Sequence, residues 1–211
     1  MKVSSYFQTT CISLALFLLL TISVLSDSGV THWLDGQLMA AMGQLVHPIF
    51  TQMFIFLTTI GSPVVISMIV VLLLLLARQF SIKTRISLGL FYFGTSALGL
   101  LLKHVFLRAR PNHQLLADTG YSYPSGHTLC ISLFFLVVVF LLQSWDKKWA
   151  KGATLIILGI FCLGVIFSRI YLRDHFPTDI IASILISTAA YSLFRGLHSH
   201  FSNTPTQSVL I

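Results

Sequence analysis

The sequence predicts an all-α, polytopic membrane protein with six transmembrane helices and an interfacial helix in its first outer loop. Of its 211 residues, 55% are hydrophobic and only 9% are charged, and the mean hydropathy is +0.88. A soluble domain of this size could not bury so much apolar surface, so these proportions favour a membrane protein. We expect a single membrane-embedded domain over residues 1–211.

Six apolar segments account for the predicted spans. Several are shorter than the roughly 20 residues that cross a bilayer, so flanking turns are expected to complete them. In chain order the segments are Tyr6–Leu25, Pro63–Ala77, Ile86–Leu102, Thr128–Leu142, Gly152–Phe167 and Ile180–Phe194.

The first segment has an alternative interpretation as a signal peptide. It follows Lys2, and Val24 and Ser26 suit a cleavage site. A retained span is favoured because five other spans follow and the chain needs a cytoplasmic start. Cleavage would not alter the side on which the later loops lie.

Residues 26–62 form a long connection between the first two spans. Apolar residues recur there at helical spacing beside Asp35, Gln37 and Gln44, which predicts a helix lying in the membrane interface. Two roles stay open for this helix: packing on its neighbours, or acting as a lid or guide for a substrate. The apolar residues are Leu34, Leu38, Met42, Leu45 and Ile49.

The basic residues set the orientation of the spans. With a cytoplasmic N-terminus, eight of the 13 Lys and Arg residues lie on the inner side and five on the outer side. The positive-inside rule therefore predicts a protein of the cell membrane whose outer loops face the outside or the periplasm. The inner residues are Lys2, Arg78, Lys83, Arg85, Lys147, Lys148, Lys151 and Arg195, and the outer ones are Lys103, Arg108, Arg110, Arg169 and Arg173.

Charge and histidine spacing exclude several functional classes. The net charge of +7 does not indicate nucleic-acid binding, because the basic residues are split between two membrane faces. Six aspartates and no glutamate argue against two-metal phosphohydrolase chemistry, in which several carboxylates hold the cations. The histidines match no familiar zinc-ligand spacing. We therefore predict no metal and no other cofactor, and nothing indicates an obligate protein partner.

Three polar motifs interrupt the apolar chain. They contain a lysine, two arginines, a Ser-Gly turn and two histidines, one of which has a carboxylate one helical turn away. These are the groups needed to transfer a phosphoryl group without a metal. The motifs are Lys103-x6-Arg110-Pro111, Pro124-Ser125-Gly126-His127 and Ser168-Arg169-x5-His175-x3-Asp179.

On these motifs the chain resembles the type 2 phosphatidic acid phosphatase superfamily, the integral-membrane lipid phosphatases related to vanadium haloperoxidases. Every fixed position of the three-part family pattern is met here. The resemblance also implies that Ser168 adds a hydroxyl group to the cage around the phosphate.

His175 and Asp179 are predicted to form the central catalytic pair. Four residues apart at a helix start, their side chains lie on one face and can meet. A carboxylate on one imidazole nitrogen fixes the tautomer and leaves the other nitrogen as a nucleophile. The alternative is a helix-capping aspartate beside an interfacial histidine, and the neighbouring motifs favour catalysis.

Ser125 and Gly126 form a turn that opens the fourth span. Such a turn directs backbone N–H groups and the positive end of the helix dipole toward a phosphate oxygen. His127 is then placed to protonate the leaving oxygen and later to activate water. An ordinary N-cap is the alternative.

Lys103, Arg110 and Arg169 are predicted to bind the phosphoryl oxygens and to stabilise the charge of the transition state. Lys103 ends an apolar span, so snorkelling to the interface is its alternative role. Three further charged residues are expected to be solvated at the interface rather than to bind a lipid headgroup. They are Arg108, Arg173 and Asp174.

The expected function is removal of phosphate from a membrane lipid phosphate or diphosphate, which enters sideways from the phospholipid bilayer and passes its phosphoryl group to His175. Small members of the resembled family act on undecaprenyl diphosphate or phosphatidylglycerophosphate. Phosphatidic acid hydrolysis and phosphate transfer to another lipid are alternatives within the same class. A membrane transporter or scaffold that binds an anion without turnover is the non-enzyme alternative, but binding alone needs no His–Asp pair.

Overall fold

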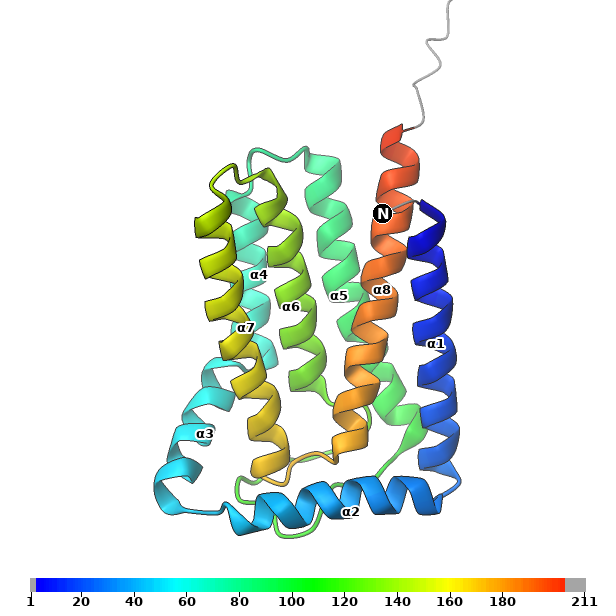
Figure 1. Ribbon diagram of the computed structural model, residues 1–211, viewed down its shortest axis with the longest axis vertical. Helices are drawn as coiled ribbons and strands as arrows, with labels where there is room; N and C mark the ends of the chain where they lie inside the picture. Colours follow the sequence, from blue (N-terminus) through cyan, green and yellow to red (C-terminus); the bar gives the residue numbers. More distant parts are fainter. Residues whose placement is uncertain (1–2, 204–211) are drawn as a thin grey trace, which may run out of the picture.

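The computed structural model describes residues 3–203, which form eight α-helices and one short 3-10 helix, with no strand among them (Figure 1). Most helices run side by side along one axis, while one lies across the end of the bundle. In chain order they are α1 Val3–Leu25, α2 Gly29–Gln44, α3 Pro48–Ile60, α4 Pro63–Leu76, α5 Ile82–Phe106, α6 Gly126–Leu141, η1 Leu142–Ser144, α7 Lys148–Tyr171 and α8 Pro177–Asn203.

Five helical segments are long and apolar enough to cross a membrane: α1, α5, α6 with η1, α7 and α8. The sixth span is the pair α3–α4, which is bent by 43°. Helix α4 alone has 14 residues, so α3 completes the predicted segment Pro63–Ala77. The bend falls where Ser62 caps α4 and Pro63 starts it, because proline has no N–H with which to continue the preceding helix. With this pair counted as one span, the prediction of six is confirmed.

The predicted interfacial helix is α2, which lies across one end of the bundle (Figure 1). Its expected extension to Ile49 is wrong, because α2 ends at Gln44 and Ile49 belongs to α3. His47 is extended and caps α3, and Pro48 begins it. A residue before proline is disfavoured in the helical conformation, so the chain turns here.

Helix α6 is the centre of the bundle and packs against α4, α5, α7 and α8. Its residues Ile131, Leu133 and Val137 are fully buried, whereas Leu19 on α1 and Ile156 on α7 are 64% and 65% exposed. An apolar exterior around a packed centre is what contact with lipid tails requires.

The three motifs meet at the end of the bundle that α2 covers. The first begins in the last turn of α5 and continues into the loop after it, the second starts α6, and the third joins α7 to α8. The described chain ends, Val3 and Asn203, lie at the opposite end (Figure 1). An even number of spans returns the chain to the side on which it started, so both described ends lie at the same end of the bundle.

Candidate active site

His175 and Asp179 form a buried pair at the junction of α7 and α8. His175 lies in the turn between the helices, and Asp179 lies in the first turn of α8. His175 Nδ1 is 3.3 Å from Asp179 Oδ2, and the two side chains are 1% and 0% exposed. The backbone N–H of Phe176 donates to the same oxygen at 2.9 Å. The i,i+4 contact predicted from the sequence is therefore present.

The contacts of the two ring nitrogens favour one tautomer of His175. An ionised Asp179 can only accept, so Nδ1 carries the proton. Arg110 Nη1 lies 3.3 Å from Nε2 and can only donate, which requires a lone pair on Nε2. Burial, with Lys103 and Arg169 nearby, lowers the pKa of His175 well below its usual value. The ring is therefore neutral at physiological pH, with a lone pair on the nitrogen that a nucleophile needs.

The serines of the motifs serve the helices that carry them. Ser125 is fully buried, and its Oγ accepts from the backbone N–H of Thr128 at 3.4 Å as the N-cap of α6. Ser168 is also fully buried and donates to the carbonyl oxygen of Val165 at 2.6 Å. The N-cap alternative thus describes the Ser125 hydroxyl in this structure, and the Ser168 hydroxyl is engaged within α7.

Gly126 and His127 line a cavity that also contains Lys103 and His175 in its lining. A β-carbon on Gly126 would lie 3.7 Å from Lys103 Cε, so the start of α6 and the Lys103 side chain are neighbours. Glycine at this position leaves the helix N-terminus accessible to an anion.

The three predicted phosphate-binding cations converge at different depths. Lys103 and Arg110 line the cavity, and both donate to carbonyl oxygens of the loop between α5 and α6. Arg169 lies deeper, is 1% exposed and donates to Thr58 Oγ1 at 2.6 Å. Positive charge therefore surrounds one side of His175, where it can stabilise phosphoryl oxygens.

One carboxylate that belongs to none of the three motifs lies between the two arginines. Asp118 Oδ2 is 3.1 Å from Arg110 Nη1 and 2.8 Å from Arg169 Nη2. Burial by itself would raise the pKa of Asp118, but the two guanidinium groups hold that pKa below its usual value. Asp118 is thus ionised and occupies arginine N–H groups that could bind a phosphate.

The expectation that Arg108 and Asp174 are solvated is wrong. The Arg108 side chain is 16% exposed and pairs with Asp35 and Asp179. Asp174 is fully buried and lies 3.1 Å from Arg169 Nη2. Burial raises the pKa of Asp174 to about 6, although Arg169 opposes the shift. The available sequence signal was that five of the six acidic residues lie in or near the segments at this end of the bundle. They are Asp27, Asp35, Asp118, Asp174 and Asp179.

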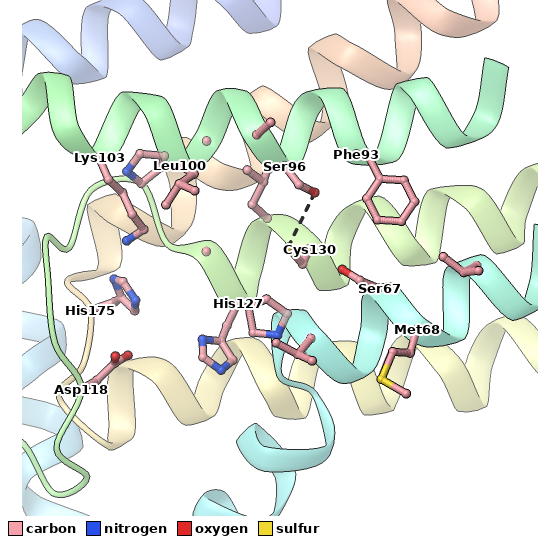
Figure 2. Close-up of a pocket in the computed structure, with 18 of the residues that line it drawn as sticks. Ser67, Met68, Phe93, Ser96, Leu100, Lys103, Asp118, His127, Cys130 and His175 are labelled. Carbon is pink, nitrogen blue, oxygen red and sulfur yellow. Dashed lines mark hydrogen bonds between the residues drawn. The ribbon is translucent and has the colours of Figure 1, made fainter. Parts of the chain in front are cut away.

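A cavity of about 1000 Å³ joins the polar groups. Its polar end holds Lys103, Arg110, Asp118, His127 and His175, most of which are labelled in Figure 2. Asp179, Ser125 and Arg169 lie behind this lining rather than in it. Across residues 3–203, no group of three or more His, Cys, Asp and Glu side chains is placed to hold a metal ion.

The rest of the cavity is mostly apolar, with Ser67 and Ser96 among its lining residues, and it reaches the lipid-facing surface. Val64, Met68 and Leu75 of α4 line it and are also 70%, 67% and 63% exposed. The cavity is therefore open sideways along α4 and α5, at the level of the membrane spans. The other apolar residues of these two helices in its lining are Pro63, Val71, Leu72, Phe93, Ala97, Gly99 and Leu100.

The family model described as PAP2 superfamily matches residues 84–201, which include all three motifs. Among curated relatives, phosphatidylglycerophosphatase B of Escherichia coli K12 is 38% identical over 80 residues, or 38% of this chain and 30% of that protein. The Bacillus subtilis protein of the same name is 30% identical over 113 residues, or 52% of this chain and 56% of the relative. An undecaprenyl-diphosphatase of Sulfolobus acidocaldarius is 32% identical over 143 residues, or 64% and 65%. The matched part of the chain thus spans less than two thirds of each relative.

Two crystal structures resemble this fold. One is a transmembrane PAP2 type phosphatidylglycerolphosphate phosphatase from Bacillus subtilis, with a TM-score of 0.81 and 20% identity over 93% of this chain and 98% of that chain. The other is LpxE from Aquifex aeolicus, with a TM-score of 0.58 and 24% identity over 75% and 93%. At these identities the likeness establishes the fold.

Proposed function

Because the chain belongs to the PAP2 superfamily, we propose that it is a metal-independent membrane phosphatase that removes phosphate from a lipid phosphate or diphosphate. The names of the relatives favour phosphatidylglycerophosphate or undecaprenyl diphosphate as the substrate. The observation that carries the proposal is one cavity in which a neutral histidine and two cations lie at the end of a mostly apolar slot that opens toward the membrane.

His175 is the nucleophile in this reaction. Its Nε2 lone pair attacks phosphorus while Asp179 holds the proton on Nδ1. Lys103, Arg110 and Arg169 stabilise the charge on the phosphoryl oxygens. The bond from phosphorus to the lipid oxygen breaks as the bond to Nε2 forms.

His127 handles the protons of both steps. It protonates the leaving lipid oxygen, and then takes a proton from the water that attacks the phosphohistidine. Release of inorganic phosphate restores neutral His175. Gly126 and His127 line the same cavity as His175, which supports this division of labour.

The lipid enters from the side. Its tail lies against Met68, Leu72 and Leu100 while its headgroup reaches the polar end, so the tail never leaves the bilayer. The charge distribution supports a site at the outer face, because the loops rich in Lys and Arg lie at the other end of the bundle.

The proposal is tested with purified protein and a panel of lipid phosphates and diphosphates, measured for release of inorganic phosphate. Wild type should release phosphate from at least one lipid, and His175→Ala should not. Phosphate found on a second lipid instead would identify a phosphotransferase. Binding without turnover on every lipid would refute the enzyme and favour an anion-binding transporter or scaffold.

A further inference from the structure

Asp179 uses both carboxylate oxygens, and the two sides serve different partners. Oδ2 faces His175 Nδ1 and the backbone N–H of Phe176. Oδ1 accepts from Arg108 Nη1 at 2.5 Å. Because the Asp179 side chain is 0% exposed, a carboxylate without this cation would carry an uncompensated buried charge. Arg108 is therefore the partner that favours the ionised form on the side away from His175.

Arg108 bridges two carboxylates from different helices. Its Nη2 donates to Asp35 Oδ2 at 2.7 Å, and its Nη1 also reaches Thr178 Oγ1 at 2.7 Å. The guanidinium carbon lies 4.2 Å from the centre of the Phe176 ring, which covers one face. The planar Arg108 guanidinium group is bound by a carboxylate on each side and has little freedom to move, so it fixes the position of Asp179.

Asp35 attaches the interfacial helix α2 to the start of α8. Its Oδ1 accepts from the backbone N–H of Thr178 at 3.0 Å, and its Oδ2 accepts from Thr178 Oγ1 at 2.8 Å. The first N–H groups of a helix have no partner within it, so Asp35 caps α8 from another helix. The Asp35 side chain is 6% exposed. Asp179 sits in the same capped turn.

We propose that Arg108 and Asp35 are positioning residues, which hold Asp179 ionised and in place so that His175 keeps its Nδ1–H tautomer. The inference rests on the proposed function of His175 as nucleophile. If Asp179 were protonated, it would donate to Nδ1, the ring proton would move to Nε2, and the nucleophilic lone pair would be lost. The interfacial helix α2 is then part of the catalytic support, because Asp35 reaches the nucleophile through three successive contacts: Asp35 with Arg108, Arg108 with Asp179, and Asp179 with His175.

The kinetic test compares Arg108→Gln and Asp35→Asn with wild type on one lipid phosphate. Arg108→Gln should lower kcat at least ~30-fold, the scale for breaking a buried charge pair, while KM and the vanadate inhibition constant change less than about threefold. Asp35→Asn keeps one amide oxygen as an acceptor for Thr178 and loses both the charge and the second acceptor. A smaller loss of kcat is expected because Arg108 can still pair with Asp179. Arg108→Lys should restore part of the rate. A rise in KM with unchanged kcat would overturn the assignment.

Arg173→Gln is the matched control. Arg173 comes from the same end of the bundle and also lies against α2, since a β-carbon on Gly43 would come within 2.8 Å of its Nη2. This variant should keep wild-type kcat. A comparable loss in Arg173→Gln would mean that any lost α2 contact slows the enzyme, and would overturn a specific role for Arg108.

A double-variant cycle separates positioning from general destabilisation. If Arg108 acts through Asp179, adding Arg108→Gln to Asp179→Asn should cost little further rate. Losses that multiply would show that Arg108 acts elsewhere and overturn the proposal.

The tautomer is measured without a substrate. Imidazole ¹⁵N shifts of the purified protein, with His175→Ala used for assignment, should show a protonated Nδ1 in wild type and a shift toward protonated Nε2 in Arg108→Gln. An unchanged tautomer overturns the proposal. This measurement stays decisive even if wild type hydrolyses no lipid, an outcome that would refute the proposed function instead. Should Arg108→Gln fail to fold, Asp35→Asn and Arg108→Lys give the same comparison.

Discussion

Replacing Asp118 with asparagine should strengthen the binding of phosphate-like anions. The Asp118 carboxylate is bound by Arg110 and Arg169 and lines the cavity that holds His127 and His175 (Figure 2). A phosphoryl group that uses these arginines must displace the carboxylate or accept a negative charge beside it. Asparagine has nearly the same shape and removes the charge.

The size of the effect follows from the exposure of the ion pairs. Arg169 is 1% exposed but the Asp118 side chain is 30% exposed, so solvent screens each contact and about 1 kcal/mol per pair is a suitable scale. Two pairs give roughly 1–2 kcal/mol, which corresponds to about 5- to 30-fold tighter binding of vanadate. Because the pKa of Asp118 lies below its usual value, the carboxylate stays charged throughout the neutral range and the difference should persist there.

The assay is the vanadate inhibition constant of purified Asp118→Asn against wild type, with KM for the lipid measured in parallel. Both constants should fall. Asp146→Asn, an exposed acidic residue in the loop between α6 and α7, is the control and should change neither. Unchanged or weaker vanadate binding in Asp118→Asn would refute competition, and would show instead that the carboxylate orients the arginines for the phosphate.

Three further results are expected. His175→Ala should abolish turnover and phosphoenzyme formation, whereas His127→Ala should slow the reaction ~100- to 10,000-fold. In single-turnover measurements, His127→Ala should lose less rate on a diphosphate lipid, because the leaving group of that substrate is already a stable anion. Equal losses on both kinds of lipid would contradict the role of His127 as leaving-group acid. Activity should survive excess chelator, because Asp118 and Asp174 both pair with Arg169, and a loss restored by zinc or magnesium would reverse this expectation. In intact cells, single cysteines in the 108–123 loop should react with a membrane-impermeant reagent, and those in the 78–85 loop should not. The opposite labelling pattern would place the site on the cytoplasmic side.

Local sequence patterns predicted most of the architecture. Apolar length located the spans, and the four-residue spacing of His175 and Asp179 predicted their contact at the start of α8 before the fold was known. These features depend on residues close together in the chain, so hydropathy and helical periodicity capture them. The catalytic roles inferred from the motifs remain predictions.

Other features depend on residues distant in the chain. Asp35 and Thr178 are separated by 143 positions, yet their contact caps α8. Arg108 resembles a solvated interfacial cation until α2 and α8 enclose it. Asp118 lies in a loop whose path places it between two arginines.

The sequence by itself therefore determined the membrane class, the order of the spans and the residues of the three motifs, because apolar length and i,i+4 spacing are properties of the local chain. The tertiary structure decided which charges are buried together. Whether Arg108, Asp118 and Asp174 meet water or an oppositely charged partner depends on how helices far apart in sequence pack. That packing places all three around His175 and shifts the pKa values of Asp118 and Asp174.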